Sequence, residues 1–361
     1  MALFTRIIGA LSLCGLFADS MLAQLPIAEL NPRIVKFPAR PISLTDVLKE
    51  LEEKTGNPIT DMRTHKSNPL LTLKTDTFWK SLDAIGKDTG IGFSAYQKGG
   101  GIALVDTPYR ALKTDHAGLF RFVFKHIAVS RDEETRTHDC KLTLDVAWEP
   151  RLKLIYLNLD SAEVGYRKAK GGLHRENLAR QVSYAVDGKS ASPLEFQFAS
   201  PERATRSLDY AKGTIRAIGA PKMLEFRFAK LEAKASLQEE KVRVAIPEVT
   251  KNPTRWSVDV ATVYPKDAIL PFESFQENDW MLNNRVWLSW IDSKTNLRNT
   301  LEPTGWSPQA AKEGIRMRHH FEARTAAPLP PSNAEATLHV LTPNRVVAFT
   351  VPFELQDLPL P

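Results

Sequence analysis

Apolar and polar residues alternate with a period of two through most of the chain after its first third. Phe120, Phe122 and Phe124 share one face of a predicted strand, while Arg121 and Lys125 lie on the other face. The same alternation recurs in four later segments, at residues 142–148, 224–228, 256–260 and 315–321. One apolar and one polar face are typical of antiparallel strands that cover a core. Because turns rich in Pro, Gly and Asn separate these short strands, the pattern predicts β-sandwiches.

The first hundred residues combine helical with strand periodicity. Apolar residues at i, i+3, i+4 and i+7 predict a first helix, and these residues are Leu44, Val47, Leu48 and Leu51. Ser43 with Asp46 resembles a capping box at its start, and Gly56 is expected to end it. A second helix is predicted from Phe78 to Gly90. Short strands are predicted at 34–37, 59–62 and 70–74, and two more flank a glycine-rich turn at 98–101.

These patterns divide the chain into domains. Residues 24–33 show little periodicity and are predicted to be a linker to an α+β module at 34–107. The remaining strands are interpreted as two tandem antiparallel β-sandwich (Ig-like) domains, 115–236 and 237–361, of about the size of one sandwich each. Leu-Asp-Val-Ala at 144–147 recurs as Val-Asp-Val-Ala at 258–261, which favours two similar halves, although strand alternation also produces chance matches. The predicted fold is therefore an α+β N-terminal module, β-α-β-β-α-β-β, followed by two sandwiches, and is mainly β overall.

The module carries a recurring pattern of apolar positions and helix ends. The pattern consists of Leu44-x-x-Val47-Leu48 before Lys54-Thr55-Gly56, followed by Leu82 and Thr89-Gly90 before the final hairpin. With this pattern, residues 34–106 resemble the short N-terminal domain of secretins and TonB-dependent receptors. The resemblance implies a periplasmic interaction module without catalytic residues. It ends at residue 106, so we do not extend the transport and pore functions of that family to this chain.

The N-terminus has the pattern of a secretory signal peptide at residues 1–23. Arg6 supplies a positive start, and Ile7 to Ala18 form an apolar run that is too short to span a bilayer. Small residues follow, so cleavage is predicted after Ser20 or after Ala23. The alternative interpretation is a buried N-terminal helix. The pattern predicts export to the periplasm or the exterior, with no transmembrane span left after cleavage.

Composition and cysteine content agree with an exported globular protein. The chain has 361 residues, of which 43% are hydrophobic and 25% are charged, and such a chain can bury a core. Cleavage of the leader would remove Cys14 and leave Cys140 alone, so no disulfide is expected within the mature chain. Cys140 shares its strand pattern with Leu142 and Leu144 and is expected to be a small packed residue.

The positive charge of the chain is unevenly distributed. The formal net charge is +6, and residues 114–236 carry 21 basic against 16 acidic side chains. The excess is greatest in one glycine-containing loop, formed by Arg167, Lys168, Lys170, Arg175 and Arg180. This loop is a candidate contact for an anionic polymer or lipid surface, and the alternative is a solvated loop without a partner. No nucleic-acid binding is predicted because no aromatic residue lies among these cations.

Catalytic and metal-binding patterns are absent from the sequence. It contains no nucleophile elbow, zinc-protease motif, Walker loop or paired cysteines, so we predict no cofactor, no metal site and no enzymatic activity. His319 and His320 are neighbours on a predicted strand and should therefore point to opposite faces, one to the core and one to solvent. Glu273, Glu277 and Asp279 are interpreted as part of a polar loop.

Three hypotheses about function follow from the sequence. The leading one is an exported, non-enzymatic interaction or scaffold protein that recognises an envelope protein or an anionic polymer. The second is a secreted carbohydrate-binding protein with exposed aromatic side chains, for which the candidates are Trp280, Trp287, Trp290 and Trp306. Since Trp287 and Trp290 are three residues apart on a predicted strand, they should lie on opposite faces, and at least one should face outward. The third is a secreted hydrolase with carboxylates on separate strands. The oligomeric state stays open.

Overall fold

The structure is a computed structural model with a mainly β fold, as the sequence pattern predicted. It describes residues 31–361 except for gaps at 98, 132, 135–137, 169–170, 179–181, 187, 266–283, 293–294, 324–328 and 332–334. The predicted signal peptide at 1–23 and most of the predicted linker at 24–33 lie outside the described residues. Among the described residues, no helix is long and apolar enough to cross a membrane.

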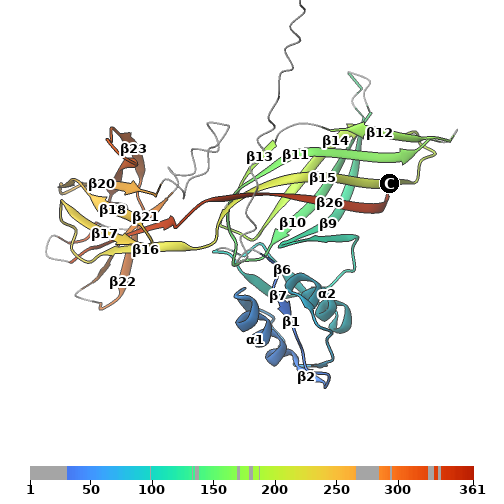
Figure 1. Ribbon diagram of the computed structural model, residues 1–361, viewed down its shortest axis with the longest axis horizontal. Helices are drawn as coiled ribbons and strands as arrows, with labels where there is room; N and C mark the ends of the chain where they lie inside the picture. The colour runs from blue at the N-terminus through green and yellow to red at the C-terminus, as the bar shows by residue number, and fades with distance from the viewer. Residues whose placement is uncertain are drawn as a thin grey trace, which may run out of the picture.

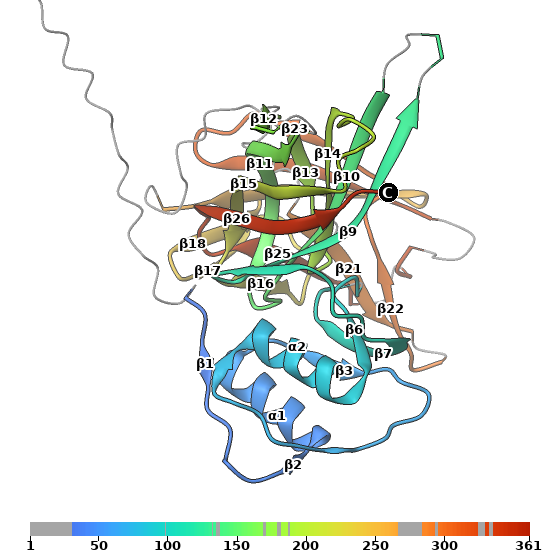
Figure 2. The same ribbon diagram turned by 90° about the vertical axis from the view of Figure 1, so that its right-hand side faces the viewer.

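The N-terminal module has two helices packed on small sheets (Figures 1 and 2). Its elements are β1 (Ile34–Val35), β2 (Ile42–Ser43), α1 (Leu44–Thr55), β3 (Ile59–Asp61), β4 (Leu70–Leu71), β5 (Asp76–Thr77), α2 (Phe78–Thr89), β6 (Ile91–Ser94) and β7 (Ile102–Pro108). The main sheet has the order β3-β7-β6, with β3 parallel to β7, and β1-β5 and β2-β4 form two further pairs. This arrangement contains the predicted order of helices and strands, with short β2 and β5 added at the helix starts.

Local signals determine where both helices begin and end. The Ser43 hydroxyl accepts a hydrogen bond from the Asp46 N–H at 3.2 Å, which satisfies one of the free donors at the start of α1. Gly56 and Gly90 end the two helices with φ of 75° and 72°. This left-handed conformation is costly for residues that have a Cβ, so glycine is the residue expected there.

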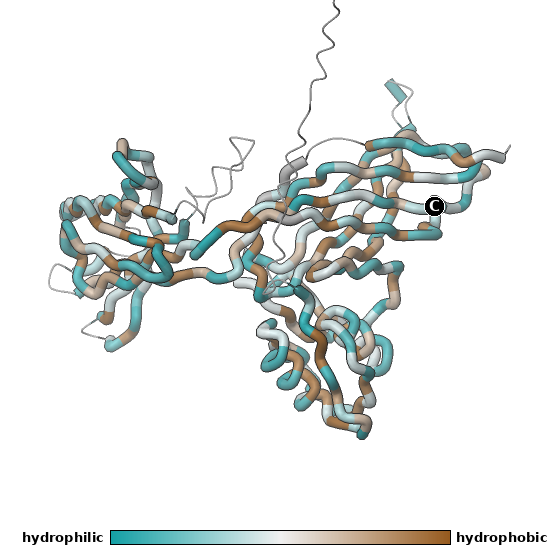
Figure 3. Tube along the Cα trace, in the orientation of Figure 1, coloured by the Kyte–Doolittle hydropathy of each residue, from teal (hydrophilic) through white to brown (hydrophobic). Residues whose placement is uncertain are grey.

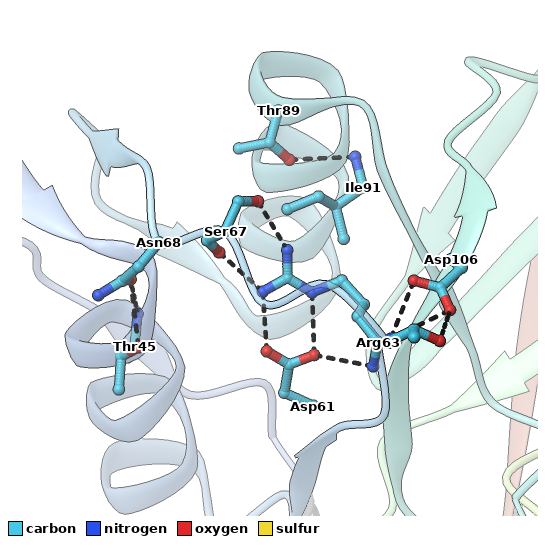
Figure 4. A network of polar contacts seen from close by, with 9 residues as sticks. Thr45, Asp61, Arg63, Ser67, Asn68, Thr89, Ile91 and Asp106 are labelled. Atoms are coloured by element: carbon cyan, nitrogen blue, oxygen red, sulfur yellow. Dashed lines mark hydrogen bonds and ion pairs between the residues drawn. The ribbon is translucent and has the colours of Figure 1, made fainter.

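One arginine holds the loop that connects β3 to β4 (Figure 4). The Arg63 guanidinium donates to both carboxylate oxygens of Asp61, at 2.9 and 2.8 Å, and to the Ser67 carbonyl at 2.9 Å. The hydrogen bonds from Arg63 outweigh burial and lower the pKa of Asp61. Because the Arg63 side chain is only 5% exposed, we assign this network a structural role.

The first sandwich follows directly on the module. One sheet has the order β14-β10-β9-β8, from β8 (Thr114–Ala117), β9 (Phe120–Arg131), β10 (His138–Trp148) and β14 (Ala191–Ala199). The other has the order β12-β11-β15-β26, from β11 (Lys153–Arg167), β12 (Leu173–Asn177), β15 (Ser207–Ala220) and β26 (Val347–Pro359), with β13 (Val182–Ala185) paired to β11. Apolar and polar positions alternate along these strands (Figure 3), and the apolar side chains of each sheet form one shared core.

The second sandwich contains the remaining strands. One sheet has the order β16-β25-β21-β22, from β16 (Met223–Phe228), β21 (Arg285–Ile291), β22 (Arg298–Leu301) and β25 (Thr337–Pro343). The other has the order β17-β18-β20-β24-β23, from β17 (Ala235–Glu239), β18 (Val242–Ile246), β20 (Arg255–Val263), β23 (Gly305–Gln309) and β24 (Ile315–Glu322), with β19 (Val249–Lys251) paired to β20. A separate hydrophobic core lies between these sheets.

The predicted boundary between residues 236 and 237 is wrong, and the two sandwiches are not in tandem. The last strand, β26, pairs with β15 and completes the first sandwich, while β16 already belongs to the second. The second sandwich is therefore inserted, at residues 223–343, between two neighbouring strands of the first. Alternation could not reveal this, because it shows which face of a strand is buried and not which distant strand is its partner.

A continuous two-stranded ribbon joins the two sandwiches. Gly219 pairs with Val347 at the end of the first sandwich, and Met223 pairs with Pro343 at the start of the second. The register is the same on both sides, and the Asn344 N–H donates to the Lys222 carbonyl at 3.0 Å in between. The inserted sandwich is thus held by paired strands rather than by a single linker (Figure 1).

Candidate functional site

The N-terminal module packs on the outer face of the β14-β10-β9-β8 sheet. The Trp79 indole N–H donates to the Leu119 carbonyl at 2.9 Å, and Trp79 is 1% exposed. Buried Asn57 donates through Nδ2 to the carboxylate of Glu149 at 3.0 Å. The core of the module also includes Ala147 of β10. Since side chains of both parts share one buried layer, the module and the first sandwich form one packed unit.

Asp83 on α2 is the centre of this interface. It is 5% exposed and accepts hydrogen bonds from Arg121 at 3.0 and 2.7 Å, from His116 at 2.8 Å and from the Tyr109 hydroxyl at 2.9 Å. Burial opposes the charged form, but the hydrogen bonds from His116 and Arg121 and the charge of Arg121 outweigh it and hold the pKa of Asp83 at about 2. The Arg121 guanidinium also lies over the Phe93 ring, 5.1 Å from its centroid.

A cleft of about 330 Å³ lies beside this contact, between the module and the first sandwich. The module contributes Gly92 to Tyr96, the end of β7 and the segment after it, and the sandwich contributes outer-face residues of β9 and β10. The lining side chains of most interest are Phe93, Tyr96, Tyr109, Arg110, Leu112 and Lys125. We call this site the junction cleft. It combines aromatic and aliphatic walls with cationic side chains.

The polar floor of the junction cleft joins three elements. The Tyr96 hydroxyl donates to Asp145 at 2.6 Å, and Lys125 forms an ion pair with the same carboxylate at 3.0 Å. Burial and the neighbouring Asp145 raise the pKa of Tyr96, so its hydroxyl stays protonated and acts as a donor. Tyr96 and Leu112 are 40% and 39% exposed, so apolar surface remains open to a ligand.

A larger hollow of about 590 Å³ lies over the outer face of the β12-β11-β15-β26 sheet. Two of its charged side chains are paired with each other, because Glu163 binds Lys212 at 3.3 Å and accepts a hydrogen bond from Tyr210. It is also more open to solvent than the junction cleft, and all of its lining residues belong to the first sandwich, so it does not lie between domains. We therefore take the junction cleft as the candidate site, since clefts between domains are frequent binding sites.

The predicted anionic-partner loop is the β11–β12 hairpin, at the end of the first sandwich far from the second (Figure 1). Arg167, Lys168 and Arg175 are exposed there, and Arg167 is 3.4 Å from Asp209. Lys170 and Arg180 lie outside the described residues. The structure places the three described cations on one hairpin and leaves their partner a prediction.

The four candidate tryptophans do not form one surface in the described part of the chain. Trp280 lies outside it. Trp290 is 3% exposed in the core of the second sandwich, so it is unavailable for stacking on a ligand. Trp287 is on the outer face of β21, and Trp306, 47% exposed, is on β23 of the opposite sheet. The prediction that Trp287 and Trp290 lie on opposite faces of β21 is confirmed, whereas the prediction that Trp290 could stack on a glycan is wrong.

Trp287 belongs to a polar cluster that the sequence analysis missed. Its ring stacks on the His339 ring at 4.8 Å, with 5° between the planes. His339 lies between Glu225, 2.9 Å from Nδ1, and the Ser289 hydroxyl, 2.7 Å from Nε2. Although this order resembles a hydrolytic triad, Ser289 is 6% exposed in mid-strand and lines neither the junction cleft nor the larger hollow. Glu225 also pairs with Arg227, so we interpret the cluster as a support for the sheet face.

The histidine pair and Cys140 lie where the sequence pattern placed them. His319 is 4% exposed, whereas His320 is partly exposed and hydrogen-bonds Ser257 at 3.0 Å. Cys140 is buried in the first core, and burial raises the pKa of its thiol, which opposes nucleophilic reactivity. Glu273, Glu277 and Asp279 lie outside the described residues. Within the described residues, no group of three His, Cys, Asp or Glu side chains is arranged to hold a metal ion.

Acidification should destabilise the second sandwich through His319. Burial lowers the pKa of His319 to about 4, so the unfolded chain binds a proton there at a higher pH than the folded chain does. Stability is therefore full above pH 6.5 and falls as the pH approaches 4. We expect His319→Leu to remove about 2 kcal/mol of the stability difference between pH 7.5 and pH 5, measured by urea unfolding. The matched change at exposed His65, His65→Asn, should leave that difference intact. An unchanged difference in His319→Leu would contradict the assignment.

Comparison with known proteins identifies no family. No protein-family model matches this sequence, and no curated protein is significantly similar to it. One solved structure with some likeness is the C-terminal globular domain of an oligosaccharyltransferase from Pyrococcus abyssi, with a TM-score of 0.17 and 8% identity. That alignment covers 65% of this chain and 49% of the other, so the chain matches about half the length of that structure. A TM-score this low transfers neither activity nor ligand.

Proposed function

We propose that this protein is an exported interaction protein that recognises a partner macromolecule through the junction cleft. One observation carries the proposal: a module fixed to a sandwich by buried polar contacts leaves an open cleft with aromatic walls and cationic side chains at the junction. A rigidly held site loses little conformational freedom on binding, which favours recognition. Aromatic and arginine side chains are also the residue types enriched where proteins bind one another.

The state of the polar groups in the cleft supports binding rather than bond-breaking chemistry. Asp145, the carboxylate that lines the cleft, is held by both Tyr96 and Lys125, and Asp83, which lies beside the cleft and outside its lining, is held by Arg121. A general acid or base needs a pKa near the working pH, whereas the pKa of Asp83 is about 2 and that of Tyr96 is raised. These groups instead fix the shape and charge of the cleft.

The compartment and the partner are also part of the proposal. The leader-like pattern at residues 1–23 supports export to the periplasm or the exterior. The resemblance of residues 34–106 to the short N-terminal domain of secretins and TonB-dependent receptors supports a partner in the bacterial envelope. The partner is then an envelope protein, or an anionic polymer of the wall. The exposed cations of the β11–β12 hairpin would offer such a polymer a second contact.

A site-specific photo-crosslink tests this function. Leu112 lines the cleft and is 39% exposed, whereas Leu237 on the second sandwich is 41% exposed. We replace each in turn by p-benzoylphenylalanine in cells that export the protein, irradiate, and analyse the adducts. The expected result is a defined macromolecular adduct at position 112, about tenfold weaker when Arg110→Glu is added, because a reversed charge opposes an anionic partner. Equal adducts at positions 112 and 237, or none at 112, would overturn the proposal.

A further inference from the structure

The junction cleft is bordered by the free edge of a β-strand. β6 is the outer strand of the β3-β7-β6 sheet, so only one of its two sides is paired with β7. Residues Gly92 to Tyr96 all line the cleft. An unpaired strand edge offers backbone N–H and C=O groups to another extended chain. The edge of β6 is therefore a second feature of the cleft, in addition to its side chains.

One contact shows which backbone groups point away from β7. The Ser190 N–H, just before β14, donates to the Ala95 carbonyl at 3.0 Å. Ala95 thus directs its carbonyl toward the first sandwich and not toward β7. Ala95 follows the end of β6, and within β6 the strand register agrees. Phe93 lies opposite Leu104, whose carbonyl accepts from the Met62 N–H on the far side of β7, so Phe93 and Leu104 form a pair that exchanges no backbone hydrogen bonds. The N–H and C=O of Phe93 consequently point to the cleft side, and no hydrogen bond from outside the strand ladder to these groups is found within the described residues.

The charges around this edge favour a negatively charged ligand. Arg110 is exposed, and no carboxylate among the described residues forms an ion pair with it. Lys125 is 44% exposed and shares Asp145 with Tyr96, while Asp145 is the single carboxylate that lines the cleft. The opening therefore presents more positive than negative charge, next to the apolar surfaces of Tyr96 and Leu112.

We infer that the occupant of the cleft is a short extended segment of a partner polypeptide, which adds as a strand to the edge of β6. Its backbone would pair with the N–H and C=O of Phe93, continuing the contact that Ser190 makes with Ala95. One set of alternate side chains, acidic in character, would face Arg110 and Lys125, and the apolar set would pack on Tyr96 and Leu112. In this mode, main-chain hydrogen bonds provide affinity and the alternating side chains provide specificity. The inference rests on the proposed function and narrows its partner to a protein.

Selection from random nine-residue peptides on the complete protein tests this inference. We expect the selected peptides to alternate acidic with apolar residues. N-methylation of one alternate set of amides in the best binder should abolish binding, whereas methylation of the other set should have little effect. Peptide binding should also slow hydrogen exchange of the Phe93 amide. Arg110→Glu should weaken affinity about tenfold, while Arg40→Glu, an equal charge change outside the cleft, should not.

The outcomes separate this inference from the function on which it rests. If the selected peptides tolerate methylation of both sets of amides, or leave exchange at Phe93 unchanged, strand addition is overturned while cleft binding stands. If no peptide is selected and the adduct at position 112 is a polysaccharide, a protein partner is overturned and the interaction function stands. If the adduct at position 112 is also absent, both proposals fail.

Discussion

Asp83→Asn is expected to lower the free energy of unfolding by about 3–5 kcal/mol, because it leaves the Arg121 guanidinium without its carboxylate in a buried interface. Arg121 is 11% exposed at the side chain and makes two hydrogen bonds to Asp83. The amide of asparagine has nearly the same shape, so lost charge rather than lost volume causes the effect. Because Tyr109 and His116 also bind Asp83, we expect the module to separate from the first sandwich before the sandwich itself unfolds.

Denaturant unfolding combined with hydrogen exchange measures this effect. Exchange should accelerate in α2 and at the amides of β6, while the second sandwich keeps its protection. Asp88→Asn is the control, since Asp88 is exposed on the same helix and should change stability by less than about 0.5 kcal/mol. Stability should also depend on pH through Asp83. The contribution of its carboxylate to the free energy of unfolding is complete above pH 4 and is lost as the pH falls toward 2. Equal effects of the Asp83 and Asp88 changes would contradict a central role for Asp83.

Local signals explain why the N-terminal module was predictable. Ser43, Gly56 and Gly90 determine helix ends through their own hydrogen bonds or backbone conformation, and these depend on neighbours within four residues. The burial pattern of each sandwich strand was predictable for a similar reason, since alternation needs only a single buried face. Fold class therefore followed from the sequence with little long-range information.

The candidate site depends on contacts that no local signal encodes. Tyr96 meets Asp145 across 49 residues, and Asp83 meets Arg121 across 38. None of these residues belongs to a motif, and a tyrosine or arginine in a strand is ordinary in any sheet protein. The charge distribution indicated the β11–β12 hairpin instead. Cations that are close in the sequence can be recognised from it, whereas charged residues that meet across a domain interface cannot. The cleft became visible only once the module was placed on the sheet.

Domain insertion was hidden for a related physical reason. The strands β15 and β26 are separated by the whole second sandwich, and nothing in the alternation of β26 distinguishes a strand of the first core from one of the second. Gly213 is the residue that most directly reflects the pairing of β15 with β26. A Cβ built there would collide with the Ser161 carbonyl oxygen of β11 and would lie 2.7 Å from the ring of Phe353, so the glycine leaves room both for the neighbouring backbone and for an aromatic side chain of the paired strand. Such complementarity can be read only after the pairing is known.

Phe353→Ala is accordingly expected to destabilise the first sandwich by about 3–5 kcal/mol, although Phe353 follows the whole second sandwich in the sequence. Phe353 is 4% exposed, and its ring stacks on Phe122 at 4.8 Å and contacts Phe196 at 6.1 Å. Removal of the ring loses its burial and leaves a cavity between the two sheets, since a packed core relaxes only in part.

Segment-resolved hydrogen exchange during denaturant unfolding distinguishes insertion from a tandem order. With the second sandwich inserted, Phe353→Ala should accelerate exchange in β9, β11 and β15 and leave β18, β20 and β24 protected. A tandem order would place the loss in the second sandwich, and that result would refute the pairing of β26 with β15. Thr350→Ala on the exposed face of the same strand is the control and should shift stability by less than about 0.5 kcal/mol. The two-stranded ribbon runs from β15 and β26 into β16 and β25. Any effect of Phe353→Ala that does reach the second sandwich should therefore begin at the β16–β25 pair.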